Sequence, residues 1–213
     1  MRHLPLIMAL ISSAAFGAEI PLSSSNGGKF VESVEKYINS LKHISGRFEQ
    51  RSSNGAKDEG VFYISKPGRM RLEYKSPILL VADGTSLVYQ DKSLDQISYV
   101  PLDANPAAVV LSGSLSLSDP KSQIAPKEIR DLGETTELDL SSPHEKQSGS
   151  ITLLFANRPL SLAGWRVKDA HNITTEVRLS EIKPAADGFP ASLFKITRAS
   201  RGINDKRPQS KYY

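Results

Sequence analysis

The chain has 213 residues, a formal net charge of +4 and an isoelectric point near 9.2, and it contains no cysteine. The missing cysteines exclude disulfides, a zinc–cysteine site, a thiol nucleophile and the lipid-modified N-terminus of a lipoprotein. The positive excess is too small for the basic footprint of a nucleic-acid-binding protein.

The first 17 residues have the order of a secretory signal peptide. Arg2 and His3 precede a mostly apolar stretch over 4–16, which closes in the small-residue site Ala15-Phe16-Gly17. This order is typical of exported proteins, and the stretch is shorter than the ~20 residues of a membrane-spanning helix. We expect residues 1–17 to be removed and residues 18–213 to form one exported domain.

One amphipathic helix is predicted after the polar spacer 23–28. Its apolar residues recur at three- and four-residue spacing: Phe30, Val31, Val34, Tyr37, Ile38 and Leu41. Charged residues fill the opposite side, as in a helix with one buried face.

From Ile44 the hydrophobic period changes to two, which predicts strands. The cleanest alternation places Met70, Leu72 and Tyr74 on one face and charged residues on the other. Strands are expected over 44–51, 59–65, 69–75, 78–82, 87–90, 96–100, 137–140, 151–155, 164–168, 174–182 and 193–197.

A short helix interrupts the strands. Asn105-Pro106 supplies a cap and a first helical residue, and a small apolar segment follows: Ala107, Ala108, Val109, Val110 and Leu111. The fold class predicted from all these elements is mostly β (α+β), a single curved antiparallel sheet with an N-terminal helix and short inserted helices.

The motifs of catalysis and metal binding are missing. His3 lies in the signal segment, His43 at the helix end, and His144 and His171 in polar turns. No histidine pair has metal-ligand spacing and Gly-x-Ser-x-Gly does not occur. We expect no enzymatic activity, no metal and no cofactor.

Three strands carry more apolar residues than one thin sheet buries. The segments 61–64, 78–81 and 87–89 are apolar on both faces. An ordinary packed core is the simpler explanation of such runs. The alternative is an apolar ligand cavity beneath a lid of short side chains at 107–111.

The order and spacing of several motifs resemble a known family. They are Phe48-Glu49-Gln50, the run from Gly60 to Tyr74, Leu80-Val81-Ala82-Asp83-Gly84, Val88-Tyr89, Asp95-Gln96 and Asn105-Pro106. In this order they resemble the outer-membrane lipoprotein carrier proteins (LolA) of Gram-negative bacteria. The resemblance is clear over about 30–113, and the second half matches by strand order.

The resemblance implies an incomplete β-barrel of about eleven antiparallel strands, with lid helices over a hydrophobic cavity. It also implies a periplasmic carrier that takes lipoproteins from an inner-membrane ABC-type releasing complex and passes them to an outer-membrane receptor lipoprotein. We expect the carrier to be a monomer that binds no nucleic acid.

Two sets of residues follow from the resemblance, one for the cavity wall and one for the lid. The wall is expected to contain Phe48, Met70, Leu72 and Tyr74, together with Leu87 and Tyr89 of the doubly apolar strand. The lid corresponds to residues 107–111.

One position departs from the family pattern. Family members usually carry an arginine just before the proline of the turn at 66–67, where it bonds to the lid backbone; here the residue is Lys66. Lysine lacks the planar five-donor fork, so a weaker latch is expected.

Two further interpretations remain open at this point. One is a carrier of free lipid or glycolipid with the same fold. The other is a periplasmic module that senses lipoproteins, although such regulators usually bear an additional domain and this chain has no room for a full one.

Overall fold

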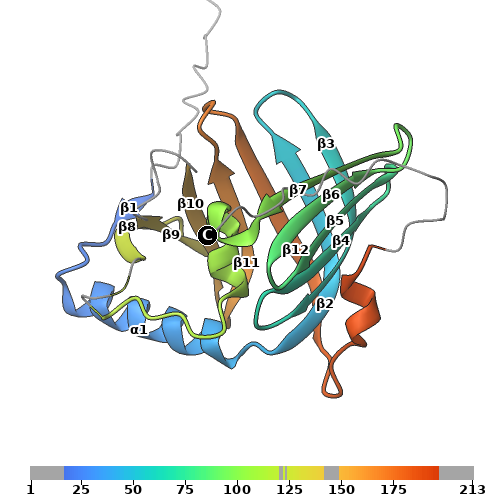
Figure 1. Cartoon of the computed structure of the whole chain (residues 1–213). Helices are drawn as coiled ribbons and strands as arrows, with labels where there is room; N and C mark the ends of the chain where they lie inside the picture. Colours follow the sequence, from blue (N-terminus) through green and yellow to red (C-terminus); the bar gives the residue numbers. More distant parts are fainter. Residues whose placement is uncertain (1–16, 120–121, 123, 142–148, 197–213) are drawn as a thin grey trace, which may run out of the picture.

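The computed structural model describes residues 17–119, 122, 124–141 and 149–196. Within them, twelve strands form one antiparallel sheet that does not close on itself (Figure 1). The strands are β1 (Ala18–Glu19), β2 (His43–Ser52), β3 (Lys57–Ser65), β4 (Arg69–Tyr74), β5 (Ile78–Asp83), β6 (Ser86–Asp91), β7 (Gln96–Pro101), β8 (Ala125–Asp131), β9 (Thr135–Ser141), β10 (Ser150–Asn157), β11 (Leu160–Lys168) and β12 (Thr174–Pro184). The helices are α1 (Ser25–Ser40) and the 3-10 helices η1 (Leu102–Ala104), η2 (Pro106–Leu111) and η3 (Ala191–Phe194).

The sheet runs in the order β1-β8-β9-β10-β11-β12-β2-β3-β4-β5-β6-β7. Most neighbours are hairpins, and β12 pairs with β2 to join the two halves of the chain. Strands β7 and β1 are the free edges. Figure 1 shows the sheet curving so that η2 lies between its two arms.

Helix α1 covers one end of the concave face. The Ser24 hydroxyl caps its first turn by accepting a hydrogen bond from the Gly27 amide at 3.0 Å. Its apolar side buries Val31, Val34 and Ile38, as the spacing predicts. The helix begins at Ser25, earlier than expected, because this cap stabilises a first turn that contains two glycines.

The structure corrects the sequence prediction at both ends of the second half. Strand β8 was not predicted, since its alternation is mostly charged and only Ile129 is a large buried side chain. The strand expected over 193–197 is wrong for residues 193–196, because η3 occupies 191–194 and no strand follows as far as Ile196; residue 197 lies outside the described residues. Phe194 inserts into the outer face of the sheet, and a helical turn starting after Pro190 presents it.

Nearly all large apolar side chains belong to one cluster on the concave face, to which α1, η2 and both arms of the sheet contribute. A smaller cluster lies on the outer face, where Phe194 packs on Leu79 and Val81. In the part of the chain that the structure describes, no helix is long and apolar enough to cross a membrane.

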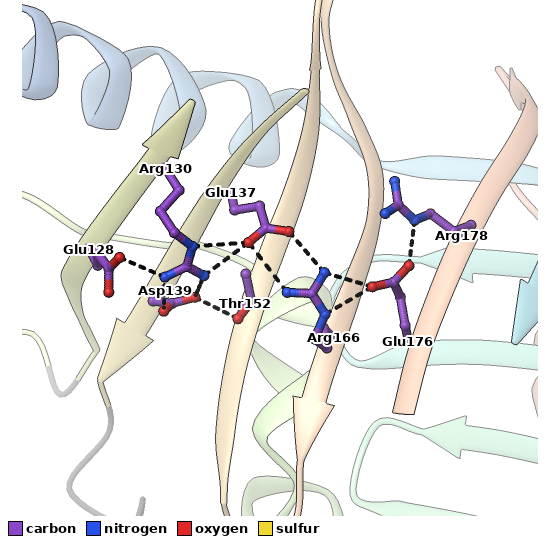
Figure 2. A network of polar contacts seen from close by, with 8 residues as sticks. All are labelled: Glu128, Arg130, Glu137, Asp139, Thr152, Arg166, Glu176 and Arg178. Atoms are coloured by element: carbon purple, nitrogen blue, oxygen red, sulfur yellow. Dashed lines mark hydrogen bonds and ion pairs between the residues drawn. The ribbon is translucent and has the colours of Figure 1, made fainter. Parts of the chain in front are cut away.

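The outer face of β8–β12 carries a ladder of alternating charges (Figure 2). Glu137 lies at its centre, only 6% exposed, between Arg130 at 2.9 Å and Arg166 at 2.8 Å. Arg166 also binds Glu176, which in turn accepts from Arg178 at 2.7 Å. With Thr152 of β10, which donates to Asp139 of β9, the ladder links the five adjacent strands β8–β12.

Burial alone would raise the pKa of Glu137, but the hydrogen bonds and charges of Arg166 and Arg130 outweigh it and hold the pKa below its ordinary value. A carboxylate whose pKa is lowered on folding stabilises the fold above its unfolded pKa of about 4.3. That contribution is lost as the pH falls through the native pKa.

We expect Glu137→Gln to lower the free energy of unfolding by about 1–3 kcal/mol at neutral pH, because two arginines lose their shared charge partner. The variant should also lose less stability than the wild type on acidification. Urea unfolding at neutral and acidic pH measures both effects. Glu49→Gln, at an exposed carboxylate on the same face, is the control and should change little. Equal effects of the two variants would contradict a central role for Glu137.

Candidate functional site

The predicted wall residues share the concave face of β2, β4 and β6. Phe48, Met70, Leu72 and Leu87 are buried there, in the same cluster as the lid. Tyr74 is half-buried beside them. Tyr89 points to the same side as Leu87 but is 42% exposed, towards the free edge at β7.

A glycine makes room for the aromatic part of this wall. Gly60 of β3 lies directly opposite Phe48 of β2. A Cβ at this position would overlap the Glu73 carbonyl and come within 2.9 Å of the Phe48 ring. The ring therefore lies close to the backbone of β3 at Gly60, and it packs edge-to-face with Tyr74, with ring centroids 4.9 Å apart.

Tyr74 brings a polar atom to this largely apolar surface. Its hydroxyl donates to the Gln50 side-chain oxygen at 2.8 Å. Burial, helped by the charge of Asp58, raises the pKa of Tyr74 well above its ordinary value, so the phenol stays neutral.

The lid is a 3-10 turn rather than an α-helix. Backbone bonds from Ala108 to Asn105 and from Ser112 to Val109 define it. Val109, Val110 and Leu111 are each no more than 4% exposed. The turn reaches across the concavity to β10 and β11. The side chain of Ala107 lies outside what the structure describes, and Ala108 is partly exposed.

Behind the lid, the chain continues along α1 and contributes two more buried leucines, Leu115 and Leu117. Asn39 holds Leu115 reciprocally, accepting from its amide and donating to its carbonyl, both at 2.8 Å. The Glu35 carboxylate accepts from the Leu117 amide at 2.8 Å. Sequence reasoning missed both anchors, because each joins residues far apart in the chain.

In front of the lid, the turn between β3 and β4 makes the connection. The Gly68 amide donates to the Leu111 carbonyl at 2.9 Å. Gly68 has φ +75°, a conformation that suits glycine. Beside this bond a groove of about 670 Å³ runs along the lid rim, lined by Pro67, Thr85, Leu102, Leu111 and neighbouring residues.

Lys66 lies at this turn, but its ammonium points elsewhere. It donates to the Ile38 carbonyl near the C-terminal end of α1 at 2.8 Å. The lid bond at this turn therefore comes from a backbone amide, and Lys66 joins the turn to the helix. Burial lowers the pKa of Lys66 to about 8.

These contacts describe an apolar surface covered by a short aliphatic segment. Wall and lid pack as one cluster, with the aliphatic lid side chains occupying the concavity. No group of His, Asp or Glu that could hold a metal occurs among the described residues. The chemistry that this face offers is reversible burial of hydrocarbon.

Residues 39–197 match the family model described as outer membrane lipoprotein carrier protein LolA. The chain belongs to this family. The match contains the predicted wall and lid residues and both arms of the sheet.

Two relatives that match over nearly their whole length agree with this LolA-family assignment. The outer-membrane lipoprotein carrier protein of Cupriavidus pinatubonensis is 28% identical over 211 residues, covering 92% of this chain and 95% of the relative. The protein of the same name from Ralstonia nicotianae is 28% identical over 212 residues, covering 92% of each. A solved LolA superfamily protein from Nitrosomonas europaea is 10% identical, with a TM-score of 0.43, over 78% of this chain and 97% of that one.

We expect Asn39→Ala to loosen the segment behind the lid, because the amide and carbonyl of Leu115 both lose their partner. Amide hydrogen exchange at Leu115 should accelerate about tenfold, with a change of at most about 1 kcal/mol in global stability. Ser40→Ala, which removes only a local bond in the last turn of α1, is the control. Unchanged exchange at Leu115 would show that the apolar contacts alone hold the segment.

The lowered pKa of Lys66 makes the stability of the protein depend on pH. Its native pKa of about 8 lies below the usual value of a lysine, so between these values the unfolded chain binds more protons than the native state. Stability should therefore rise from pH 8 towards pH 10.5 relative to Lys66→Met, by roughly 1–2 kcal/mol after allowance for partial exposure. Urea unfolding at several pH values measures this. Lys42→Met removes an exposed lysine nearby, and its free energy of unfolding should change with pH as that of the wild type does. If the free energy of unfolding of Lys66→Met also followed the wild type over this pH range, the burial effect would be refuted.

Proposed function

We propose that this LolA-family protein carries lipoproteins and holds their acyl chains on the concave face beneath η2. The observation that supports this most directly is the composition of the cover: a short turn of aliphatic side chains closes a large apolar face. Phe48, Met70, Leu72, Tyr74, Leu87 and Tyr89 would form the wall, and residues 107–111 the lid.

Burial of the lid side chains and burial of an acyl chain on this face would contribute similar free energies. Burial of an aliphatic side chain stabilises the closed form by about 1.5–3 kcal/mol, and each buried CH₂ of a cargo chain contributes about 0.8 kcal/mol. Cargo that enters must displace the three buried lid side chains. The displaced contacts offset much of the gain, which keeps cargo binding reversible.

The polar fastenings of the lid suit such an exchange. The bonds of Leu111, Leu115 and Leu117 to the turn and to α1 are ordinary neutral or carboxylate–amide hydrogen bonds. Each contributes about 0.5–3 kcal/mol net, and water replaces each when the segment moves away. The lid can therefore open without disturbing the ladder of the sheet.

The wider setting of this function is part of the proposal. Residues 1–16, which carry most of the expected signal peptide, lie outside the described residues; after removal of residues 1–17, residues 18–213 would act as one domain. We propose a monomer without catalytic activity in the periplasm. It would accept cargo from an inner-membrane ABC-type complex and deliver it to an outer-membrane receptor lipoprotein.

Native mass spectrometry of the protein isolated from periplasm tests the cargo. Co-purifying triacylated peptide is the expected result. Bare phospholipid or glycolipid would favour a free-lipid carrier instead. If depletion of the protein in cells left lipoproteins sorted normally, a carrier role in this pathway would be wrong.

A charge on the exposed part of the wall tests the face assignment. Tyr89→Glu should weaken binding of a synthetic triacylated peptide at least about tenfold, because a carboxylate opposes acyl burial. Stability should change little, since Tyr89 is 42% exposed. Tyr99→Glu makes the same change on the opposite face of neighbouring β7 and should bind normally. Fluorescence titration measures both, and equal affinities would remove Tyr89 from the wall.

A further inference from the structure

A second pocket lies on the outer face of the sheet, away from the wall and lid. It has a volume of about 670 Å³ and forms where the C-terminal segment crosses β4–β6. Leu79, Leu193 and Ile196 give it an apolar floor, and its polar lining includes Arg71, Gln90, Lys92, Asp95, Ser192 and Lys195.

The pocket is positively charged. Arg71, Lys92 and Lys195 face one carboxylate among the lining residues, Asp95. Arg71 has a structural role, since it pairs with Glu73 and donates to the Leu193 carbonyl at 3.0 Å, holding the segment in place. Lys92 and Lys195 are exposed, and neither has an ion-pair partner in the described ranges. The lysines supply the free charge.

The residues that follow the pocket in the sequence, 197–213, are also rich in Lys and Arg. The structure describes the chain as far as Ile196, at the pocket rim. Residues 197–213 contain five Lys and Arg and one Asp, while the remainder of the chain contains twenty-two residues of each sign. The whole positive excess of the protein therefore follows directly after the pocket.

An exposed apolar side chain lies in the same turn as Lys92. Leu94, in the turn between Lys92 and Asp95, is 63% exposed. The Asp91 carboxylate accepts from the backbone amides of Ser93 and Leu94 and fixes this turn. An exposed leucine two positions from Lys92, at the edge of a pocket lined by Lys92 and Lys195, suits a surface with anionic headgroups over hydrocarbon better than a small soluble anion.

We propose that this outer-face pocket docks the protein on the surface of an anionic phospholipid bilayer. Lys92 and Lys195 bind headgroup phosphates, Leu94 enters the interface, and the positive net charge of the chain adds long-range attraction. The concave face with its lid is on the other side of the sheet, so membrane contact and cargo binding use separate surfaces. This docking does not depend on the proposed cargo.

Vesicle flotation of the full-length protein tests the proposal. Vesicles of phosphatidylcholine with one-third phosphatidylglycerol should bind the wild type, and pure phosphatidylcholine vesicles should not. The Lys92→Glu/Lys195→Glu variant should partition at least about tenfold less. Binding should fall between about 50 mM and 500 mM NaCl, as charge screening requires.

The Lys29→Glu/Lys36→Glu variant is the matched control, with the same change of net charge on exposed positions of α1. It should retain binding within about threefold. If both variants lost vesicle binding equally, net charge alone would explain the loss, and the assignment of the pocket as the docking site would be overturned. The assignment would also be overturned if Lys92→Glu/Lys195→Glu bound the anionic vesicles as well as the wild type does. It would likewise be overturned if inorganic phosphate, at constant ionic strength, displaced the wild type from these vesicles. Triacyl-peptide binding, measured in parallel, should be the same in all three proteins, so a failure here is separable from failure of the carrier role.

Discussion

The apolar packing of η2 against the concave face is the interaction on which the rest of the molecule depends. A twelve-stranded antiparallel sheet that curves this strongly has an inner face too large for its single long helix to cover. Val109, Val110 and Leu111 cover part of the remainder, followed by Leu115 and Leu117. All are aliphatic and buried, yet they belong to a short turn and an irregular segment, which hydrogen bonds from neighbouring elements hold in place. The side chains of this cover are therefore closely packed, whereas only a few hydrogen bonds join its backbone to the neighbouring elements.

The outer face is stabilised in two different ways, and both make the frame rigid around this cover. On one arm, the ladder centred on Glu137 crosses the strands with charge-assisted hydrogen bonds. On the other arm, the C-terminal segment packs Phe194 onto Leu79 and Val81, and Arg71 ties it down. Neither device touches the lid. In the proposed function, movement of the lid would therefore leave these contacts of the sheet intact.

The sequence predicted those parts of the fold whose signal is local. The helical spacing of Val31, Val34 and Ile38 and the alternation of β4 each identify one buried face, and the structure confirms both. Strand β8 has too few apolar residues to be recognised alone; its neighbours β1 and β9 determine its conformation. The anchors of the lid could not be predicted either, because Asn39 and Leu115 are 76 positions apart and Glu35 and Leu117 are 82 apart. The wall residues were predictable as one face of alternating strands, whereas the filling of the concavity by the lid became visible only in three dimensions.

Lys66 shows how the exchange of lid for cargo can be adjusted. A guanidinium at this position offers a fork of donors that can bridge the turn and the lid at once. The lysine ammonium is engaged by α1, and the lid is left with a backbone bond from Gly68. In the proposed function, lid and acyl chain would bury similar hydrocarbon, so small differences in the hydrogen bonds of the lid would decide which of them occupies the concave face. A carrier whose lid is held by few hydrogen bonds would lose fewer contacts when cargo enters and regain fewer when cargo leaves. The direction of transfer would then have to come from the proposed partners at the two membranes, through their lower or higher affinity for the acyl chains.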